Sequence, residues 1–322
     1  MTTFKEIRGT AVQSVSSDPS NPESGQLWYN NSIGVLKGYA LVAGSWASGG
    51  NMGAARRILA GCGTQTAGLA FGGFNITSQS ATEEYDGSAW TGGGNLGTAR
   101  RLLAGAGTQT AGLGFGGYVT GPVNNTEEYD GSAWTGGGNM GTARYSLAGS
   151  GTQTAGLAFG GFTTTNSTAT EEYDGSAWTA GGNMVTARRT LAGAGTQTAG
   201  LGFGGYTTAA VNNTEEYDGS AWTAGGNLGT ARYQLGGAGT QTAGLAFGGL
   251  DTATAVTAVT EEYNGTLWTA STAMTTARRG LGGAGTQTAG LAFGGFSTAN
   301  TDVTEEYTGS SLAAKTITTS TS

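Results

Sequence analysis

Glutamate and arginine are the residues of this 322-residue chain whose types and spacing could do chemistry, because a carboxylate can move protons and a guanidinium can hold an anion. The arginines recur once per repeat, at Arg56, Arg100, Arg144, Arg188, Arg232 and Arg278, and a Glu-Glu-Tyr triplet follows each of them. Such pairs could serve sugar chemistry. A catalytic group is needed only once, however, so six copies favour structural ion pairs.

The remaining composition removes other kinds of active site. Histidine is absent, so neither a Ser-His-Asp triad nor a histidine metal site can be built. Cys62 is the single cysteine, which excludes an intrachain disulfide, and we interpret it as a small buried filler. It aligns with small residues in the other repeats: Ala106, Ser150, Ala194, Ala238 and Ala284. We expect a non-enzymatic protein without cofactor or metal.

Charge and hydropathy narrow the partners. Charged residues make up 11% of the chain and the formal net charge is −7, which suits neither nucleic acid nor anionic lipid as a partner. No apolar run approaches the roughly 18 residues of a membrane span, so we expect no membrane insertion. Met1 to Thr10 lacks the apolar stretch of a signal peptide. We expect a soluble protein made in a cytoplasm.

A repeat of about 44 residues must position the glutamates and arginines. Its tryptophans follow one another with gaps of 44, 44, 44, 44 and 46 residues, and a Gly-Thr-Gln-Thr-Ala-Gly run keeps the same gaps. The tryptophans are Trp46, Trp90, Trp134, Trp178, Trp222 and Trp268. A period of this length is typical of propeller blades or of helical arrays, and the residue types must decide between them.

The residue types favour strands. Large and small residues alternate along Gly68 to Gly73, and so much glycine and threonine would make poor helices. The first unit predicts four strands and an Asp86-Gly87 turn between the last two. These strands lie near Arg57 to Gly63, Ala67 to Phe74, Thr82 to Asp86 and Ser88 to Gly92. Each unit is therefore predicted to be a four-stranded antiparallel sheet.

The order of these residues resembles the kelch repeat. Gly72-Gly73 is followed by Glu84-Tyr85-Asp86, then Trp90, then Leu96 and Arg100, and the pattern recurs. The resemblance implies an all-β, six-bladed kelch-like β-propeller with four-stranded antiparallel blades. It gives structural roles to Gly72, Gly73, Tyr85, Arg100 and the six tryptophans. Two departures are Leu312, which stands in the tryptophan position after the last triplet, and the Gly-Thr-Gln-Thr-Ala-Gly turn.

The chain divides by composition into residues 1–43, a repeat region over 44–308, and a Thr/Ser-rich tail over 309–322, which we expect to be mobile or bound to a partner. The repeats open with a fourth-strand signature at Trp46 and end with a third-strand signature at Tyr307. We therefore expect the N-terminal strand to complete the last blade. The competing closure uses Ser311 to Ile317.

Residues 1–43 supply a second resemblance. After a proline-punctuated linker, Gly25 to Asn30 and Gly34 to Tyr39 predict a short N-terminal β-hairpin that anchors the protein. A Gly-Gln-Leu-Trp-Tyr-Asn strand followed by Trp-x-x-Gly-Gly-Asn units is similar to structural proteins of tailed marine bacteriophages. The resemblance implies a virion location, as a capsid decoration or tail-fibre component. Residues 1–43 would then bind other virion proteins, with a homo-oligomer in the particle as one arrangement.

The segments between the second and third strands differ freely among otherwise copied units. They are predicted to form one face of the disc, suited to binding a glycan or protein of a host surface. The alternative is neutral drift at a tolerant site. The candidate binding residues are Asn75, Thr77, Gln79, Asn124, Asn125, Asn166, Asn212, Asn213, Asp251 and Asn300. A second hypothesis is a stand-alone carbohydrate-binding or protein-interaction propeller, unconnected with a virion.

Overall fold

The structure of the protein is a computed structural model that describes residues 12–20 and 25–317. Within these ranges the regular elements are β-strands and no helix occurs, as the all-β prediction requires. The chain divides into two compact units. The repeat unit is Ser45–Gly309, and the terminal unit comprises Met1–Gly44 together with Ser310–Ser322.

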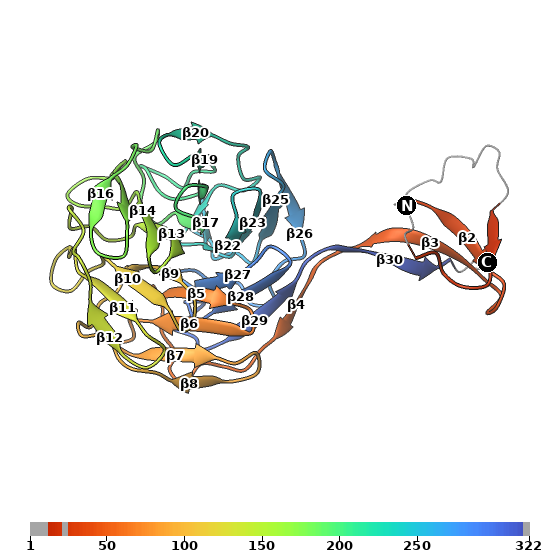
Figure 1. The fold of residues 1–322 in the computed structure, drawn as a ribbon, viewed down its shortest axis with the longest axis horizontal. Helices are drawn as coiled ribbons and strands as arrows, with labels where there is room; N and C mark the ends of the chain where they lie inside the picture. Colours follow the sequence, from red (N-terminus) through yellow and green to blue (C-terminus); the bar gives the residue numbers. More distant parts are fainter. Residues whose placement is uncertain (1–11, 21–24, 318–322) are drawn as a thin grey trace. The chain divides into compact units, whose positions relative to one another are not determined.

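The described repeat unit contains six four-stranded antiparallel sheets (Figure 1). Their first strands gather around a common centre in this view, and their fourth strands lie at the periphery. The first strands are β5 (Ala60–Thr64), β9 (Ala104–Gly107), β13 (Ala148–Thr152), β17 (Ala192–Gly195), β22 (Gly236–Thr240) and β27 (Gly282–Gly285). The second are β6 (Ala67–Phe71), β10 (Gly112–Phe115), β14 (Ala155–Phe159), β18 (Gly200–Phe203), β23 (Ala243–Phe247) and β28 (Ala289–Phe293).

The outer half of each sheet repeats in the same way. The third strands are β7 (Thr82–Tyr85), β11 (Thr126–Tyr129), β15 (Thr170–Tyr173), β19 (Thr214–Tyr217), β25 (Thr260–Tyr263) and β29 (Thr304–Thr308). The fourth are β8 (Trp90–Gly92), β12 (Trp134–Gly136), β16 (Trp178–Ala180), β20 (Trp222–Ala224), β26 (Trp268–Ser271) and β4 (Ser45–Ser48). The four strands predicted in the first unit are thus confirmed, with shorter bounds.

Backbone conformation explains the shorter bounds. Ile58 has a φ of 50°, so β5 cannot begin before it, whereas the predicted strand began at Arg57. Gly72 and Gly73 have φ of 66° and 102° and end β6 at Phe71. Beyond these breaks the chains meet again, because Arg57 and Phe74 form an isolated β-bridge. At the equivalent position of a later repeat, the chains form the short strand pair of β21 (Arg232–Tyr233) and β24 (Leu250–Asp251).

The N-terminal strand completes the last sheet, as expected. β4 pairs with β29 and sets Trp46 opposite Tyr307. The competing closure by Ser311 to Ile317 is wrong, because β30 (Ser311–Thr316) pairs instead with β3 (Val35–Val42). Leu312 lacks a tryptophan's role because Trp46 already fills that place.

Small residues allow the first strands to approach one another. A Cβ on Gly105 would lie 2.8 Å from Cζ of Phe71 and 3.0 Å from the carbonyl oxygen of Gly61, both in the preceding sheet. Farther out, Phe71 packs against Trp134, with ring centroids 4.7 Å apart. The buried clusters therefore lie between neighbouring sheets, and each sheet depends on the next for its core.

A cyclic belt of six backbone hydrogen bonds surrounds the centre. In it the amide of each residue donates to the carbonyl of the equivalent residue one repeat earlier, and the amide of Ile58 donates to Gly280. The members are Ile58, Leu102, Ser146, Thr190, Gln234 and Gly280. All six have φ between 50° and 58°. The left-handed conformation turns each peptide toward its neighbour, so the belt ties all six repeats together.

The terminal unit is a four-stranded sheet in the order β1 (Gln13–Val15), β2 (Leu27–Asn30), β3 and β30. The hairpin predicted from Gly25 to Tyr39 is present as β2 and β3. The expectation of a mobile tail is wrong for Ser311–Thr316, whose backbone pairs along β3. Binding of this segment to a partner stays a prediction. For residues 1–11 and 318–322 the expectations lie outside the described residues.

Asp18 organises the polar side of the terminal unit. Its carboxylate accepts hydrogen bonds from Lys37 Nζ at 2.6 Å, Asn30 Nδ2 at 3.0 Å and Trp28 Nε1 at 3.0 Å. These contacts, that from Lys37 first, lower the pKa of Asp18 to about 2.

In the described ranges no helix has the length and apolarity needed to cross a bilayer.

Candidate functional site

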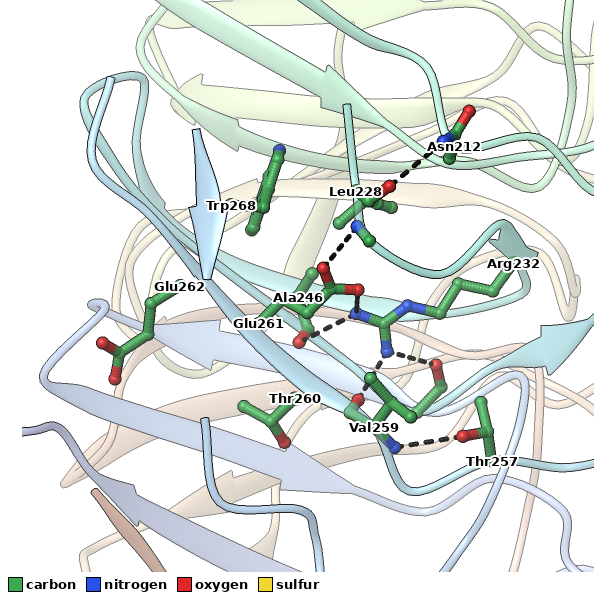
Figure 2. Close-up of polar contacts among 12 residues, drawn as sticks. Asn212, Leu228, Arg232, Ala246, Thr257, Val259, Thr260, Glu261, Glu262 and Trp268 are labelled. Atoms are coloured by element: carbon green, nitrogen blue, oxygen red, sulfur yellow. Dashed lines mark hydrogen bonds and ion pairs between the residues drawn. The ribbon is translucent and has the colours of Figure 1, made fainter. Parts of the chain in front are cut away.

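The side chain of the repeated arginine is buried against its own sheet and forms an ion pair with the first glutamate of the triplet (Figure 2). Arg232 is fully buried and its Nη2 lies 3.1 Å from Oε1 of Glu261. The guanidinium also donates to the carbonyl oxygens of Val259 at 2.5 Å and Ala246 at 3.4 Å. Glu261 in turn accepts the amide of Gly229 at 2.6 Å. The pair therefore fixes the link from the preceding sheet onto β25.

All six repeats contain this ion pair. Burial lowers the pKa of Arg144 to about 10, opposed by the charge of Glu171, so the guanidinium stays charged at neutral pH. Breaking a buried pair of this kind costs about 3–5 kcal/mol, because one charge is left uncompensated. The geometry supports the interpretation of Arg100 and its equivalents as structural residues. Both groups are enclosed by protein, which leaves them unsuited to receive a substrate.

The second glutamate of each triplet joins neighbouring sheets. The hydroxyl of Tyr129 donates to Oε1 of Glu84 in the preceding sheet at 2.5 Å. The indole of Trp134 donates to Oγ1 of Thr82 in that sheet at 2.9 Å. Equivalent bonds recur around the repeat unit, including Tyr85 to Glu306 and Trp90 to Thr304. The tryptophans and Tyr85 thus fill the gaps between sheets, which is a structural role of the kind that the kelch resemblance implied.

The Gly-Thr-Gln-Thr-Ala-Gly turn has a role that the sequence analysis missed. Nε2 of Gln153 donates to the carbonyl oxygens of Gly112 at 3.0 Å and Tyr129 at 2.7 Å, both in the preceding sheet. Gln65, Gln109, Gln197, Gln241 and Gln287 make the same two contacts in their repeats. The identical glutamine in every copy was the available signal for a clamp between sheets.

Two of the candidate binding residues, Asn166 and Asn300, connect neighbouring loops. Oδ1 of Asn166 accepts Nη1 of Arg189 at 3.1 Å, and its Nδ2 donates to the carbonyl oxygens of Tyr206 and Thr207. Asn300 makes the equivalent contacts with Arg57 and with the carbonyls of Phe74 and Asn75. Both amide side chains therefore hold the loops together.

Other candidates serve their own loops. Nδ2 of Asn124 donates to the carbonyl of Met140, and Asn212 does the same to Leu228. The backbone carbonyls of Asn125 and Asn213 accept the buried arginines of their repeats. Asp251 caps its turn by accepting the amides of Ala253 and Ala255.

Asn75, Thr77 and Gln79 occupy the tip of the first loop. Asn75 and Thr77 are exposed, and Gln79 donates back to the carbonyl and hydroxyl of Thr77. These residues lie at the same end of their sheet as Asn300, which reaches Asn75 from the neighbouring loop. The structure therefore brings the candidates together at one end of the sheets.

A set of stacked side chains on that end went unnoticed in the sequence analysis. Arg57 lies over the rings of Phe74 and Phe296, with its guanidinium carbon 5.3 and 4.9 Å from their centroids. Arg101 lies 4.9 Å from both Phe74 and Tyr118. We call the whole set the arginine–aromatic girdle. Its members are Arg57, Phe74, Arg101, Tyr118, Tyr145, Phe162, Arg189, Tyr206, Tyr233, Arg279 and Phe296.

The signal for the girdle lies in two aligned positions. The residue after the buried arginine is arginine in four repeats and tyrosine in the other two, and the residue after the double glycine is aromatic except at Leu250. Tyr145 takes the arginine place between Tyr118 and Phe162, at ring distances of 5.2 and 5.5 Å. Either arginine or tyrosine can therefore occupy this place, although Tyr145 meets Tyr118 edge to face, at an interplanar angle of 77°.

Burial raises the pKa of Cys62 to about 12, so its thiol is protonated at neutral pH, in keeping with a buried filler. Among the described residues no group of three or more Cys, Asp or Glu side chains is arranged to hold a metal ion.

No protein-family model matches the chain, and no curated protein matches it either.

Proposed function

We propose that the chain is a non-enzymatic structural protein of a tailed bacteriophage particle. In this proposal the repeat unit is a six-bladed kelch-like β-propeller that displays its loops for adhesion or protein contact. Residues 1–43 bind other virion proteins. The protein would be made in the host cytoplasm and act in the virion.

The observation that carries the non-enzymatic part is that the buried arginines and both glutamates of every triplet are used in packing. The six buried arginines pair with glutamates of their own sheets, and the other six glutamates accept tyrosine hydroxyls from neighbouring sheets. The longest stretch that differs among the repeats is the loop at one end of each sheet. A constant scaffold with variable loops suits binding.

The propeller part of the proposal is supported by cyclic contacts. Each first strand contacts the first strand of the next sheet, and β27 contacts β5. The belt of six backbone hydrogen bonds follows the same cycle. Electron cryomicroscopy of the purified chain is expected to give class averages with pseudo-sixfold views of the repeat unit. Averages with another repeat symmetry would contradict the six-bladed architecture.

Mass spectrometry of purified phage particles tests the virion role. The chain is expected among the particle proteins, and labelling it with an antibody should locate it on head or tail. Its absence from particles of the phage that encodes it would overturn this role. A chain absent from particles that still binds a glycan array would favour the stand-alone propeller instead.

A further inference from the structure

Four arginines of the arginine–aromatic girdle bring positive charge to the loop-bearing end of an acidic protein. They are Arg57, Arg101, Arg189 and Arg279, which we call the arginine ring. Among the described residues none of the four has a carboxylate within ion-pair distance. Their polar partners are neutral: Asn300, Ser78, Asn166 and Gln234 respectively. The charge of the ring is therefore not neutralised by an ion pair within the described residues.

The guanidiniums are held in place before any ligand arrives. Arg189 is stacked between Phe162 and Tyr206, at 4.7 and 4.9 Å from the centroids, and Nη1 is fixed by Asn166. A guanidinium clamped on both faces can present its N–H groups only at its edge. An edge of this kind matches the paired oxygens of a carboxylate or sulfate.

The guanidinium charges of the ring are also close enough to repel one another. Burial and the charges of Arg279 and Arg101 lower the pKa of Arg57. Among the described residues no carboxylate forms an ion pair with Arg57 that would offset this repulsion. Asp86, Asp130, Asp174 and Asp218 lie in the turns at the other end of the sheets, where each accepts hydrogen bonds within its own turn. Asp251 and Asp302 lie at the same end as the ring, but neither forms an ion pair with its arginines.

We propose that the arginine ring binds carboxylate or sulfate groups of an acidic polysaccharide. This inference specifies the ligand of the display surface proposed above. A polysaccharide is favoured because the surroundings of the ring offer groups for sugar hydroxyls. A hollow beside Arg189 is lined by Ser146, Thr190, Gln234 and the phenols of Tyr206 and Tyr233. Phe74 and Phe296 each face two guanidiniums, so recognition at these rings depends on charge and hydrogen bonds.

Direct binding to the purified full chain tests the proposal. The probes are an alginate oligosaccharide for carboxylate, a heparin oligosaccharide for sulfate, a dextran oligosaccharide as the neutral control, and poly-L-glutamate as the acidic peptide. We expect saturable binding of alginate or heparin, weakened by added salt, with no comparable binding of dextran. Equal binding of dextran, or poly-L-glutamate binding as tightly as both polysaccharides, would overturn the inference.

The repeats themselves supply a matched variant. Tyr145 and Tyr233 show that tyrosine fits the arginine place, so Arg57→Tyr with Arg101→Tyr should keep the stack and remove two charges. We expect the double variant to bind at least about tenfold more weakly while its melting temperature stays close to that of the parent. Tyr145→Arg should strengthen binding.

Unchanged affinity in both variants would overturn the proposal. Should the double variant unfold, Tyr145→Arg and the single Arg101→Tyr variant still decide it. These outcomes are independent of the virion role. A chain that binds alginate but is missing from particles refutes the virion proposal alone, and a chain found in particles without polysaccharide binding refutes only this one.

Discussion

The ring centroids of Trp46 and Tyr307 lie 5.0 Å apart, although the two residues come from opposite ends of the repeat unit. Trp46 also packs against Phe247 of the neighbouring sheet and donates to Oγ1 of Thr260 at 3.0 Å. Trp46, on β4, thus joins the last sheet to the sheet before it.

Trp46→Ala is therefore expected to destabilise the whole repeat unit by about 3–5 kcal/mol, because a large side chain leaves a cavity between two sheets. Urea unfolding followed by circular dichroism measures the loss. Trp134→Ala, in a sheet made from one continuous segment, is the matched control and should cost about the same. If Trp134→Ala lowers the free energy of unfolding and Trp46→Ala leaves it unchanged, β4 does not complete the last sheet in solution.

Alkaline pH should weaken the contacts between sheets. Burial, and then the bond to Glu84, raise the pKa of Tyr129 to about 12 from its ordinary value near 10. A raised pKa means that the unfolded chain loses this proton first. Stability is then complete below pH 10 and falls as the pH rises from about 10 through 12. The same shift, to about 12, applies to Tyr85, Tyr173, Tyr217 and Tyr263.

Melting temperatures across this range, with tyrosinate absorbance at 295 nm, test the alkaline transition. Tyr129→Phe should cost about 1–3 kcal/mol at neutral pH, because Glu84 loses its donor, and should reduce the alkaline loss. A protein whose stability is constant up to pH 12 would refute the role of these phenols.

The buried ion pair predicts strong coupling between Arg144 and Glu171. Arg144→Met should cost about 3–5 kcal/mol, because the carboxylate keeps its charge in a buried place. Adding Glu171→Gln removes that charge and keeps an acceptor for the amide of Gly141. The double variant should recover about 1–3 kcal/mol relative to the sum of the single losses, measured by chemical denaturation. Additive losses would mean that the pair is not formed.

The glutamine clamp gives a separate prediction. Gln153→Ala should lower the free energy of unfolding by about 1–3 kcal/mol, since two carbonyl groups of the preceding sheet lose a donor. Hydrogen exchange should rise at the strands on both sides of this junction. Thr154→Ala, at an exposed position of the same turn, is expected to stay within about 0.5 kcal/mol of the parent. Equal effects of the two substitutions would argue against the clamp.

The periodic residues made most of the strand arrangement predictable. Alternation at Leu69 and Phe71 gave the second strand, and the spacing of Trp46 and Tyr307 gave the completion of the last sheet. The strand ends were less accessible, because a positive φ at Ile58 depends on a hydrogen bond to Gly280 in another repeat. Serine and threonine in Ser311–Thr316 suggested a tail, yet their backbone can pair with any long edge strand such as β3.

The candidate binding residues were harder to judge from sequence. Asn166 and Asn300 were chosen as polar loop residues, but what an amide contacts depends on the neighbouring repeat. The arginine ring was not predicted from the sequence. Arginine and tyrosine at equivalent positions of the repeats, such as Arg101 and Tyr145, look like ordinary variation at a protein surface. Only the stack shows that both occupy the same place between two aromatic rings.

The cyclic belt uses main-chain atoms alone, so no particular side chain is needed at its six positions. Isoleucine, leucine, serine, threonine, glutamine and glycine occupy them, six different residue types in otherwise copied repeats. For the five that are not glycine the left-handed conformation costs about 1–2 kcal/mol each, a strain that recurs whichever of them is present. The centre of the molecule is thus open to evolutionary change: new side chains can be tried there while the architecture around them stays constant.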